Sequence, residues 1–522
     1  MKSIHQIHSN NMSEAIRHSS QDLLTYFSRE VNGLKDSKAQ IRSASLKVLL
    51  AEFTKEPKLK PCKDYSDIIQ ELLEELLKPV IKLVCDEKEQ CRDLSTNILT
   101  LYELFSFMNE CIDPAGSLSY LFPVIVDRLG AYDLEGEQNL PEQLKPVPSQ
   151  KPQIVKNPPE KSEEIRKNLA KLTLAIFEKS TPQLLFGYLD EATSICKALV
   201  MDPVSGDTIQ VGCQALSILS QKCTERLLHF SEQLGRSLFT SLVHKHWKVR
   251  KSGLEAIKDV MYCGVYKYNS VLVEQLVGFR DPNVVPIKDF YEPSTRLNYL
   301  AMLVNDKSAH VRAKFFEVIA NWLTKLPDRF DHESRLIPYM LSGLFDPIPE
   351  IKEDCFRYIE EIGQQYEEEK EKDIRSIRQL GYQEPWTCDG IMADLPLPDP
   401  FVKRPRLGSR LFFRQYVRRY LNAIFIELGD WISASRLYSS QLLLALIIFT
   451  EESITMYLEK FLTCMCKAMN INNSSEIMKN LELATKLVGR FVDTDSYMPQ
   501  VLSAVRVRYG IYSHQRNHIY VL

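Results

Sequence analysis

The chain has 522 residues, of which 44% are hydrophobic and 25% are charged, and its formal net charge is −3. A single hydrophobic core rarely grows beyond about 250–300 residues, so this length requires several domains or an elongated, repetitive body. The near-neutral charge gives no overall reason to expect nucleic acid or an anionic membrane as the main partner.

The first residues of the chain are polar and lack the apolar core of a signal peptide. We expect residues 1–18 to form a flexible N-terminus. The longest apolar run is Leu442 to Phe449, far shorter than the roughly 20 residues that span a bilayer. The sequence therefore predicts a soluble protein that is not secreted.

Apolar residues recur at i, i+3, i+4 and i+7 through nearly every segment, whereas β-branched alternation is rare. This periodicity predicts helices over residues 20–33, 39–54, 67–84, 88–108, 117–129, 163–180, 183–200, 206–223, 226–242, 247–263, 294–304, 308–325, 333–345, 349–366, 409–428, 431–449, 452–469, 474–491 and 496–506. Short polar turns join consecutive helices, which is typical of antiparallel helix hairpins.

An acidic residue followed six positions later by a basic one marks five of these hairpins. The pairs are Asp36–Arg42, Asp86–Arg92, Asp306–Arg312, Asp346–Lys352 and Asp430–Arg436, and His244–Arg250 keeps only the cation. Counted from the acid, apolar residues at +5, +12 and +13 and mostly small residues at +9 share one helical face. The repetition predicts an all-α fold, an α-solenoid of stacked antiparallel helix pairs forming a HEAT/armadillo-like superhelix.

This repetition gives the acidic and basic pair a structural interpretation. The acid lies in the turn before the second helix, where we expect it to cap the free N–H groups of that helix. The basic residue lies in the first turn of the helix, from which we expect it to reach the acid of a stacked repeat. A catalytic Asp/Arg pair would not be repeated five times.

Two segments interrupt the helical pattern. Residues 132–162 are rich in Pro, Gln, Lys and Glu, which predicts a disordered loop between the two helices of one repeat, with a Pro-rich adaptor ligand as the alternative. Residues 367–408 are charged and then Pro-rich, and we expect Trp386, Ile391, Met392 and Phe401 to tuck part of them against the body. The predicted repeats are N-terminal over 19–131, middle over 163–366 and C-terminal over 409–506, followed by a non-repeat tail over 507–522.

The sequence contains no phosphate-binding loop, dinucleotide fingerprint, nucleophile elbow or H-E-x-x-H motif. His244-Lys245-His246 is the one histidine cluster, and we interpret it as a polar turn rather than a metal site. The twelve cysteines lack a Cys-x-x-Cys pair and mostly lie in apolar helical contexts, as expected of reduced, buried thiols. We predict no catalytic residue, metal or cofactor.

One charge pattern remains. Arg410, Arg414 and Arg418 are spaced at i, i+4 and i+8 on a predicted helix, and Lys403 to Arg406 adds "KRPR" upstream. The functional interpretation is a surface for an acidic partner, or a nuclear localisation patch. The alternative is a face that only keeps the protein soluble.

Two stretches carry a more specific resemblance. "WLTKLPDRFDHESRLIPYMLSGLFD", from Trp322 to Asp346, and the segment from Arg404 to Leu462, which includes Gly429-Asp430-Trp431, closely resemble the HEAT-repeat axonemal dynein assembly factors, the assembly factor 5 family. The resemblance is strong from about Val249 to Val505 and mostly repeat-like before that.

The resemblance implies a cytoplasmic, non-enzymatic scaffold in the cell body of ciliated cells. Such a scaffold would hold axonemal dynein heavy and intermediate chains together with chaperones and other assembly factors before the arms reach motile cilia. It implies no nucleic acid, membrane or small-molecule substrate. The alternative function is a HEAT-repeat transport receptor or a phosphatase-type regulatory scaffold.

The last predicted helix departs from the repeat pattern, because "RYGIYSHQRNHIYVL" follows it where a partner helix is expected. A solenoid end needs a polar cap. From this departure we expect a truncated product, a splice form or a faulty gene model.

Overall fold

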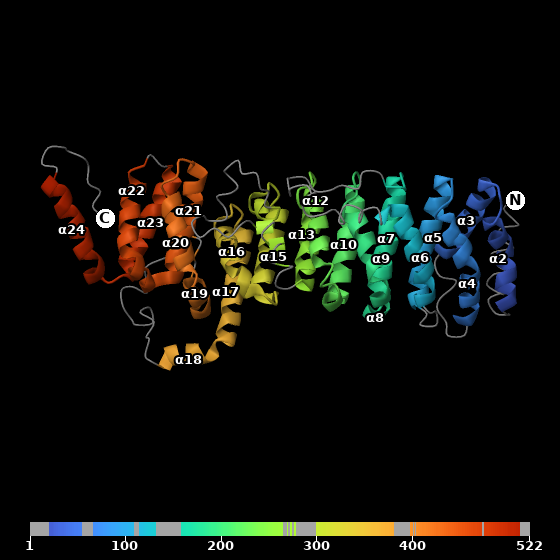
Figure 1. Ribbon diagram of the computed structural model, residues 1–522, viewed down its shortest axis with the longest axis horizontal. Helices are drawn as coiled ribbons and strands as arrows, with labels where there is room; N and C mark the ends of the chain where they lie inside the picture. Colours follow the sequence, from blue (N-terminus) through green and yellow to red (C-terminus); the bar gives the residue numbers. More distant parts are fainter. Residues whose placement is uncertain are drawn as a thin grey trace, which may run out of the picture. The chain divides into compact units, whose positions relative to one another are not determined.

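The computed structural model describes residues 20–54, 66–108, 114–131, 158–264, 299–379, 403–471 and 474–511, with a few further positions at 269–277 and 397–401. Within these ranges the secondary structure is helical and contains no strand, as predicted (Figure 1). The chain divides into two compact units, Met1–Asn269 and Ser270–Leu522.

The first unit is a series of helix pairs. Its α-helices are α2 (Ser20–Leu34), α3 (Ala39–Thr54), α4 (Ser66–Leu83), α5 (Glu89–Met108), α6 (Pro114–Leu129), α7 (Glu163–Lys179), α8 (Pro182–Leu185), α9 (Leu189–Val200), α10 (Gly206–Lys222), α11 (Ser231–Ser237), α12 (Phe239–Leu242) and α13 (Trp247–Cys263). The second helices of the pairs, α3, α5, α7, α10 and α13, pack side by side in one layer, and α2, α4, α6, α9 and α11 form the other.

Prolines mark the first-helix layer. Pro79 lies inside α4 and Pro123 inside α6, and Pro338 lies inside α16 of the second unit. A proline within a helix removes one backbone hydrogen bond and kinks the helix.

The second unit continues the same construction. Its elements are η6 (Ala301–Asn305), α15 (Ala309–Lys325), α16 (Arg329–Ser342), α17 (Pro349–Glu369), α18 (Glu371–Gln379), α19 (Leu407–Arg414), α20 (Val417–Glu427), α21 (Ser433–Thr450), η8 (Glu451–Tyr457), α22 (Leu458–Met469), α23 (Ser475–Phe491) and α24 (Thr494–Ile511). Packing runs from α15 to α17, then through α19 to α21 and α23.

The predicted apolar face is the buried one. Positions +5, +12 and +13 from the turn acid are buried in the later repeats, as at Cys91, Ile98, Val311 and Leu443. The first repeat is the main exception, because Ile41 and Val48 at +5 and +12 are exposed.

Some predicted helix boundaries were wrong. The helix predicted over 409–428 breaks at Gln415–Tyr416 into α19 and α20, and the helix predicted over 226–242 becomes α11 and α12. Of the predicted apolar anchors in the second interruption, Phe401 is buried and stacks edge-on against Phe356 and Phe449. The other three anchors and most of the Pro-rich loop lie outside the described residues.

Candidate functional site

Eight of the turns that precede a second helix carry an acceptor side chain. Each of them accepts the backbone N–H of the residue directly before the second helix, at 2.7–3.3 Å. The acceptor–donor pairs are Asp36–Lys38, Asp86–Lys88, Glu160–Ser162, Asp202–Ser205, His244–His246, Asp306–Ser308, Asp346–Ile348 and Asp430–Ile432. The predicted capping of the helix's own N–H groups is therefore corrected, because the accepted N–H lies one residue outside the helix.

An arginine in the first turn of the second helix ties two consecutive turns together. Arg42 donates from Nη1 to the carbonyl of Asp36 at 2.9 Å and from Nε to Oδ2 of Asp86 at 2.7 Å. Arg312 does the same with the carbonyl of Asp306 and Oδ2 of Asp346, both at 2.7 Å. We call this series of contacts, from each arginine to its own turn and to the next acid, the turn ladder.

The other predicted basic residues have different partners. Arg92 binds the carbonyl of Asp86 but reaches Glu160 as its acid, with Nε 2.7 Å from Oε2. Lys352 pairs with Asp399 at 3.2 Å on the surface. Arg436 donates to the carbonyls of Asp430 and Trp431, at 2.7 and 3.1 Å.

Sequence reasoning missed three members of the ladder, Glu160, Arg166 and Asp202. Glu160 is fully buried and binds both Arg92 and Arg128. Arg166 lies six residues after Glu160 and pairs with Asp202, both side chains being buried. The six-residue spacing was present, but with Glu in place of Asp. Residues 158–162 therefore belong with the packed repeats rather than with the predicted loop.

Between Asp202 and His244 other residue types replace the arginine and the acid of the ladder. In the helix that follows Asp202, the arginine position is taken by Ile209, because α10 begins four residues after the acid instead of three. The next turn has His244 as acceptor, whose Nδ1 receives the N–H of His246 at 3.1 Å. An apolar residue and an imidazole thus replace the cation and the carboxylate together.

The ladder perturbs the acids that it binds. Burial opposes ionisation of Asp86, but hydrogen bonds from Arg42 and from the backbone of Lys88 outweigh it and lower the pKa of the carboxyl. Burial also opposes ionisation of Glu160, and the hydrogen bonds from Arg92 and Arg128 again lower its pKa. These carboxylates stay charged at neutral pH and serve packing.

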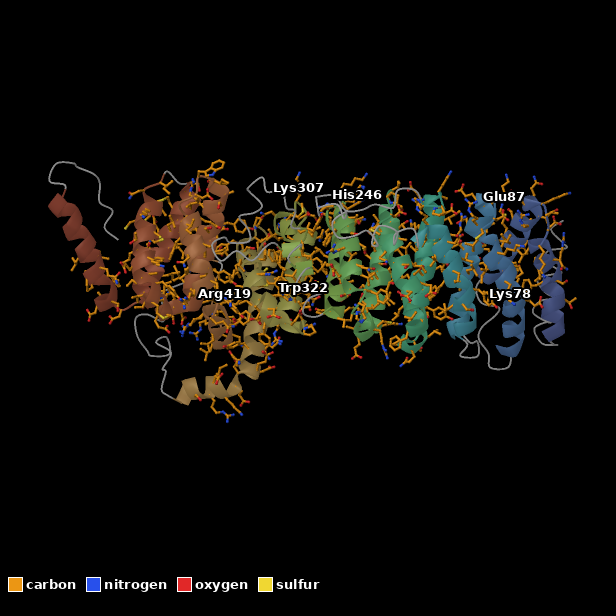
Figure 2. All side chains as sticks on the ribbon, in the orientation of Figure 1. Lys78, Glu87, His246, Lys307, Trp322 and Arg419 are labelled. Carbon is orange, nitrogen blue, oxygen red and sulfur yellow. The ribbon has the colours of Figure 1, made fainter. Side chains whose placement is uncertain are left out.

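The turns lie along one edge of each unit. Figure 2 shows Glu87 and His246 at the same edge of the first unit, with Lys78 nearer the opposite edge. In the second unit Lys307 lies in such a turn, whereas Trp322 is buried in α15 (Figure 2). Short polar turns are exposed along this edge, and the ladder arginines donate hydrogen bonds to their backbone carbonyls.

The predicted partner-binding stripe of arginines is corrected by the structure. Arg410 is only 4% exposed, and its Nη1 lies 2.6 Å from Oε2 of Glu451. Arg414 is half-buried and donates to the carbonyl of Thr450 and to Glu452, both at 3.1 Å. Arg418 is exposed and lies beyond the break between α19 and α20. The three residues do not form one exposed face.

The arginines of the upstream basic motif, Lys403 to Arg406, are also held in ion pairs. Arg404 donates two hydrogen bonds, of 2.7 and 2.8 Å, to the carboxylate of Glu451. Arg406 binds Glu367 with two hydrogen bonds of 3.1 Å, and its backbone N–H reaches Glu360 at 3.0 Å. Within this motif Lys403 is exposed, and Arg404 and Arg406 are half-buried in these ion pairs.

Histidine, cysteine and acidic side chains of the described ranges form no group of three placed to hold a metal ion. The cysteines Cys196, Cys213, Cys263 and Cys355 are buried, and burial raises the pKa of each thiol, to about 12 for Cys213. Thiols in this state are poor nucleophiles and poor metal ligands.

An open groove of about 800 Å³ lies between the starts of α3, α5 and α7. Gln40, Lys47, Glu89, Asp93 and Glu164 are among the side chains that line it. Its charges are mixed, and Asp93 accepts hydrogen bonds from Asn97 and Asn168. The groove is open to solvent, and apolar side chains such as Ala44 and Ile165 line it together with these charged and polar ones.

One helical stretch, Ser433–Met469, is long and apolar enough to cross a membrane by composition, and 67% of its most apolar window is buried inside the structure. It comprises α21, η8 and α22. Leu443, Ala445 and Ile447 of α21 are fully buried against neighbouring helices. A core helix of a repeat protein accounts for this composition.

Comparison with known proteins gives consistent matches over both units. A family model described as "Dynein axonemal assembly factor 5-like, TPR repeats" matches residues 33–145, 143–277 and 293–376. A second, described as "Dynein axonemal assembly factor 5, HEAT-repeat domain", matches residues 397–522.

Among curated proteins, dynein axonemal assembly factor 5 of Xenopus laevis is 27% identical over 496 residues, which cover 94% of this chain and 50% of that protein. The Homo sapiens protein of the same name is 26% identical over 431 residues, covering 83% and 43%. The chain thus spans about half the length of the curated relatives that it matches.

Solved structures similar to this chain include a designed armadillo repeat protein, YIII(Dq)4CqI, with a TM-score of 0.32 and 14% identity, covering 56% of this chain and 97% of that one. Kap121p bound to Ste12p has a TM-score of 0.40 and 10% identity, covering 94% and 44%. The family-model matches extend over well more than half of the residues, and they show that the chain belongs to the dynein axonemal assembly factor 5 family.

Proposed function

We propose that this chain is a non-enzymatic scaffold for the preassembly of axonemal dynein arms. It holds dynein heavy and intermediate chains, with chaperones and other assembly factors, in the cytoplasm of ciliated cells. The observation that carries the proposal is the family match, which extends over the repeats of both units.

The turn ladder supports a scaffolding role. The repeated acidic and basic side chains bind turn backbones and neighbouring repeats. Arg312, for example, binds the carbonyl of Asp306 and the carboxylate of Asp346. In stacked helical repeats each repeat packs only against its two neighbours. The outer faces of both helix layers therefore remain available to a client protein. By joining consecutive turns, the turn ladder would keep the repeats that form these faces at a fixed spacing.

Affinity capture tests the proposal. The tagged chain is expressed in cells that are building motile cilia, and the captured proteins are quantified by mass spectrometry against the tag alone and a tagged nuclear import receptor. We expect axonemal dynein chains and assembly factors to be enriched over both controls. Capture of import cargo or phosphatase subunits without dynein chains would overturn the proposal in favour of a transport or phosphatase scaffold.

A further inference from the structure

The outer side of α3 exposes apolar residues at helix positions that the next repeat buries. Ile41 is 39% exposed and Val48 is 45% exposed. Their equivalents in α5, Cys91 and Ile98, are buried. The Cys91 thiol lies 3.7 Å from the carbonyl oxygen of Ala39, so this helix position faces the preceding repeat.

The turn acid of the same repeat has an unused acceptor position. Asp36 accepts the N–H of Lys38 at 2.7 Å through Oδ1. Its equivalents Asp86, Asp202 and Asp346 each also receive an arginine from the preceding repeat. Within the described ranges, no cation reaches the carboxylate of Asp36.

We infer that the exposed side of α3 is a docking surface for a helix of a partner protein. We call it the end face and define it by Asp36, Ile41 and Val48. The partner helix is amphipathic, with an apolar stripe and an arginine near its N-terminus. It would pack as one more second helix in the layer, its guanidinium on Asp36 and its apolar stripe on Ile41 and Val48.

The dimensions and charges of the end face define this occupant. Ile41 and Val48 are seven residues apart, so they mark two helical turns along one side of α3. From Asp36 to Val48 the face extends over about 18 Å, which a partner helix of about four turns covers. The neighbouring α3–α5 contact supplies the template, since there Arg42 Nε lies 2.7 Å from Asp86 Oδ2.

Docking of a helix on the end face is independent of the identity of the proposed dynein client. It concerns one contact that the repeat geometry prescribes, and it can be tested with a helix from the chain itself. The α3 sequence already presents to α5 the surface that such a partner must present to α3, including Arg42.

The probe is a fluorescein-labelled, hydrocarbon-stapled peptide of residues 36–54, titrated against the full chain by fluorescence anisotropy up to 1 mM. We expect saturable binding, weakened at least tenfold by Ile41→Glu in the chain or by Arg42→Ala in the peptide. The charge exchange, Asp36→Arg in the chain with Arg42→Glu in the peptide, should restore at least half of the lost affinity. Circular dichroism of each chain variant controls for folding.

Three results would overturn the inference. They are no binding up to 1 mM, equal binding by the Ile41→Glu chain, and failure of the charge exchange to restore affinity. Sedimentation of the chain alone excludes another occupant. A dimer that Ile41→Glu dissolves would mean that the end face pairs with a second copy of the chain rather than with a partner helix.

Discussion

At the residue scale, Glu451 sets the conformation of the junction between α21 and η8. Its φ is 49°, the only positive φ of a residue other than glycine in the described ranges. Such a backbone conformation costs about 1–3 kcal/mol in a residue with a Cβ. Arg404 and Arg410 both bind the buried carboxylate, and these charge-assisted hydrogen bonds offset the cost.

Arg410 is therefore expected to stabilise the fold rather than to bind a partner. Arg410→Ala should lower the free energy of unfolding by about 1.5–3 kcal/mol, because it removes one of the two arginines that bind the buried carboxylate of Glu451. Arg418→Ala, the matched exposed control, should change it by less than about 0.5 kcal/mol. Urea unfolding followed by circular dichroism measures both, and equal effects would contradict the assignment.

The change of chemistry at Ile209 and His244 gives a second test. Ile209→Arg and His244→Asp should each destabilise the chain, since each introduces an unpaired charge, at a buried position for Ile209 and at a half-buried one for His244. Together they recreate the arginine and acid of the other steps, so the double variant should recover about 1–3 kcal/mol relative to the sum of the single effects. Strictly additive unfolding free energies would mean that the two positions do not face each other.

At the element scale, α17 and α19 cross at unusually short range. A Cβ at Gly408 would collide with the carbonyl oxygen of Gly363, and a Cβ at Gly363 would collide with the backbone of Ser409. Glu367 receives both the backbone N–H of Gly408 and the side chain of Arg406. Two glycines and one carboxylate thus fix the start of α19 against α17.

Gly408→Ala is expected to destabilise this crossing. The extra methyl group forces the two backbones apart, at a cost of about 1–3 kcal/mol. Gly489→Ala in α23 is the control, since nothing lies within 4 Å of a Cβ there, and it should stabilise its helix by up to about 1 kcal/mol. Thermal unfolding by circular dichroism compares the two variants, and a higher melting temperature for Gly408→Ala would refute the close crossing.

Much of the element order could be predicted, because helical periodicity and the spaced acid and arginine depend on local sequence. The partners of Arg410 could not, since Glu451 is 41 residues away and its approach depends on the packing of α21 against α19. Glu160 was missed because it follows a Pro-rich segment, although its spacing to Arg166 matched the pattern. The hydrogen bond from the hydroxyl of Tyr416, at the break between α19 and α20, to Glu333 in α16 also joins residues far apart in the sequence.

At the scale of the whole molecule, the turn ladder makes stability depend on pH. The pKa values of Asp86 and Glu160 are lower in the folded chain than their ordinary values of 3.8 and 4.5. Stability from these groups is therefore present above the unfolded pKa and lost as the pH falls through the folded pKa.

We expect the urea midpoint of the chain to fall as the pH is lowered from about 5 toward 3. Asp86→Asn should flatten this dependence and lower the midpoint at pH 7, because the neutral amide cannot form the ion pair with Arg42. A variant with the same pH slope as the wild type would show that Asp86 does not contribute to it.

Where an arginine binds the acid of the next turn, we expect the ladder to couple the two neighbouring repeats. Hydrogen exchange by mass spectrometry tests it most directly, on the wild type, Arg312→Ala, Asp346→Ala and the double variant. The account predicts faster exchange in both α15 and α17 for each single variant, and a coupling of at least about 1 kcal/mol between the two residues. Faster exchange confined to the mutated helix, with additive effects, would contradict it.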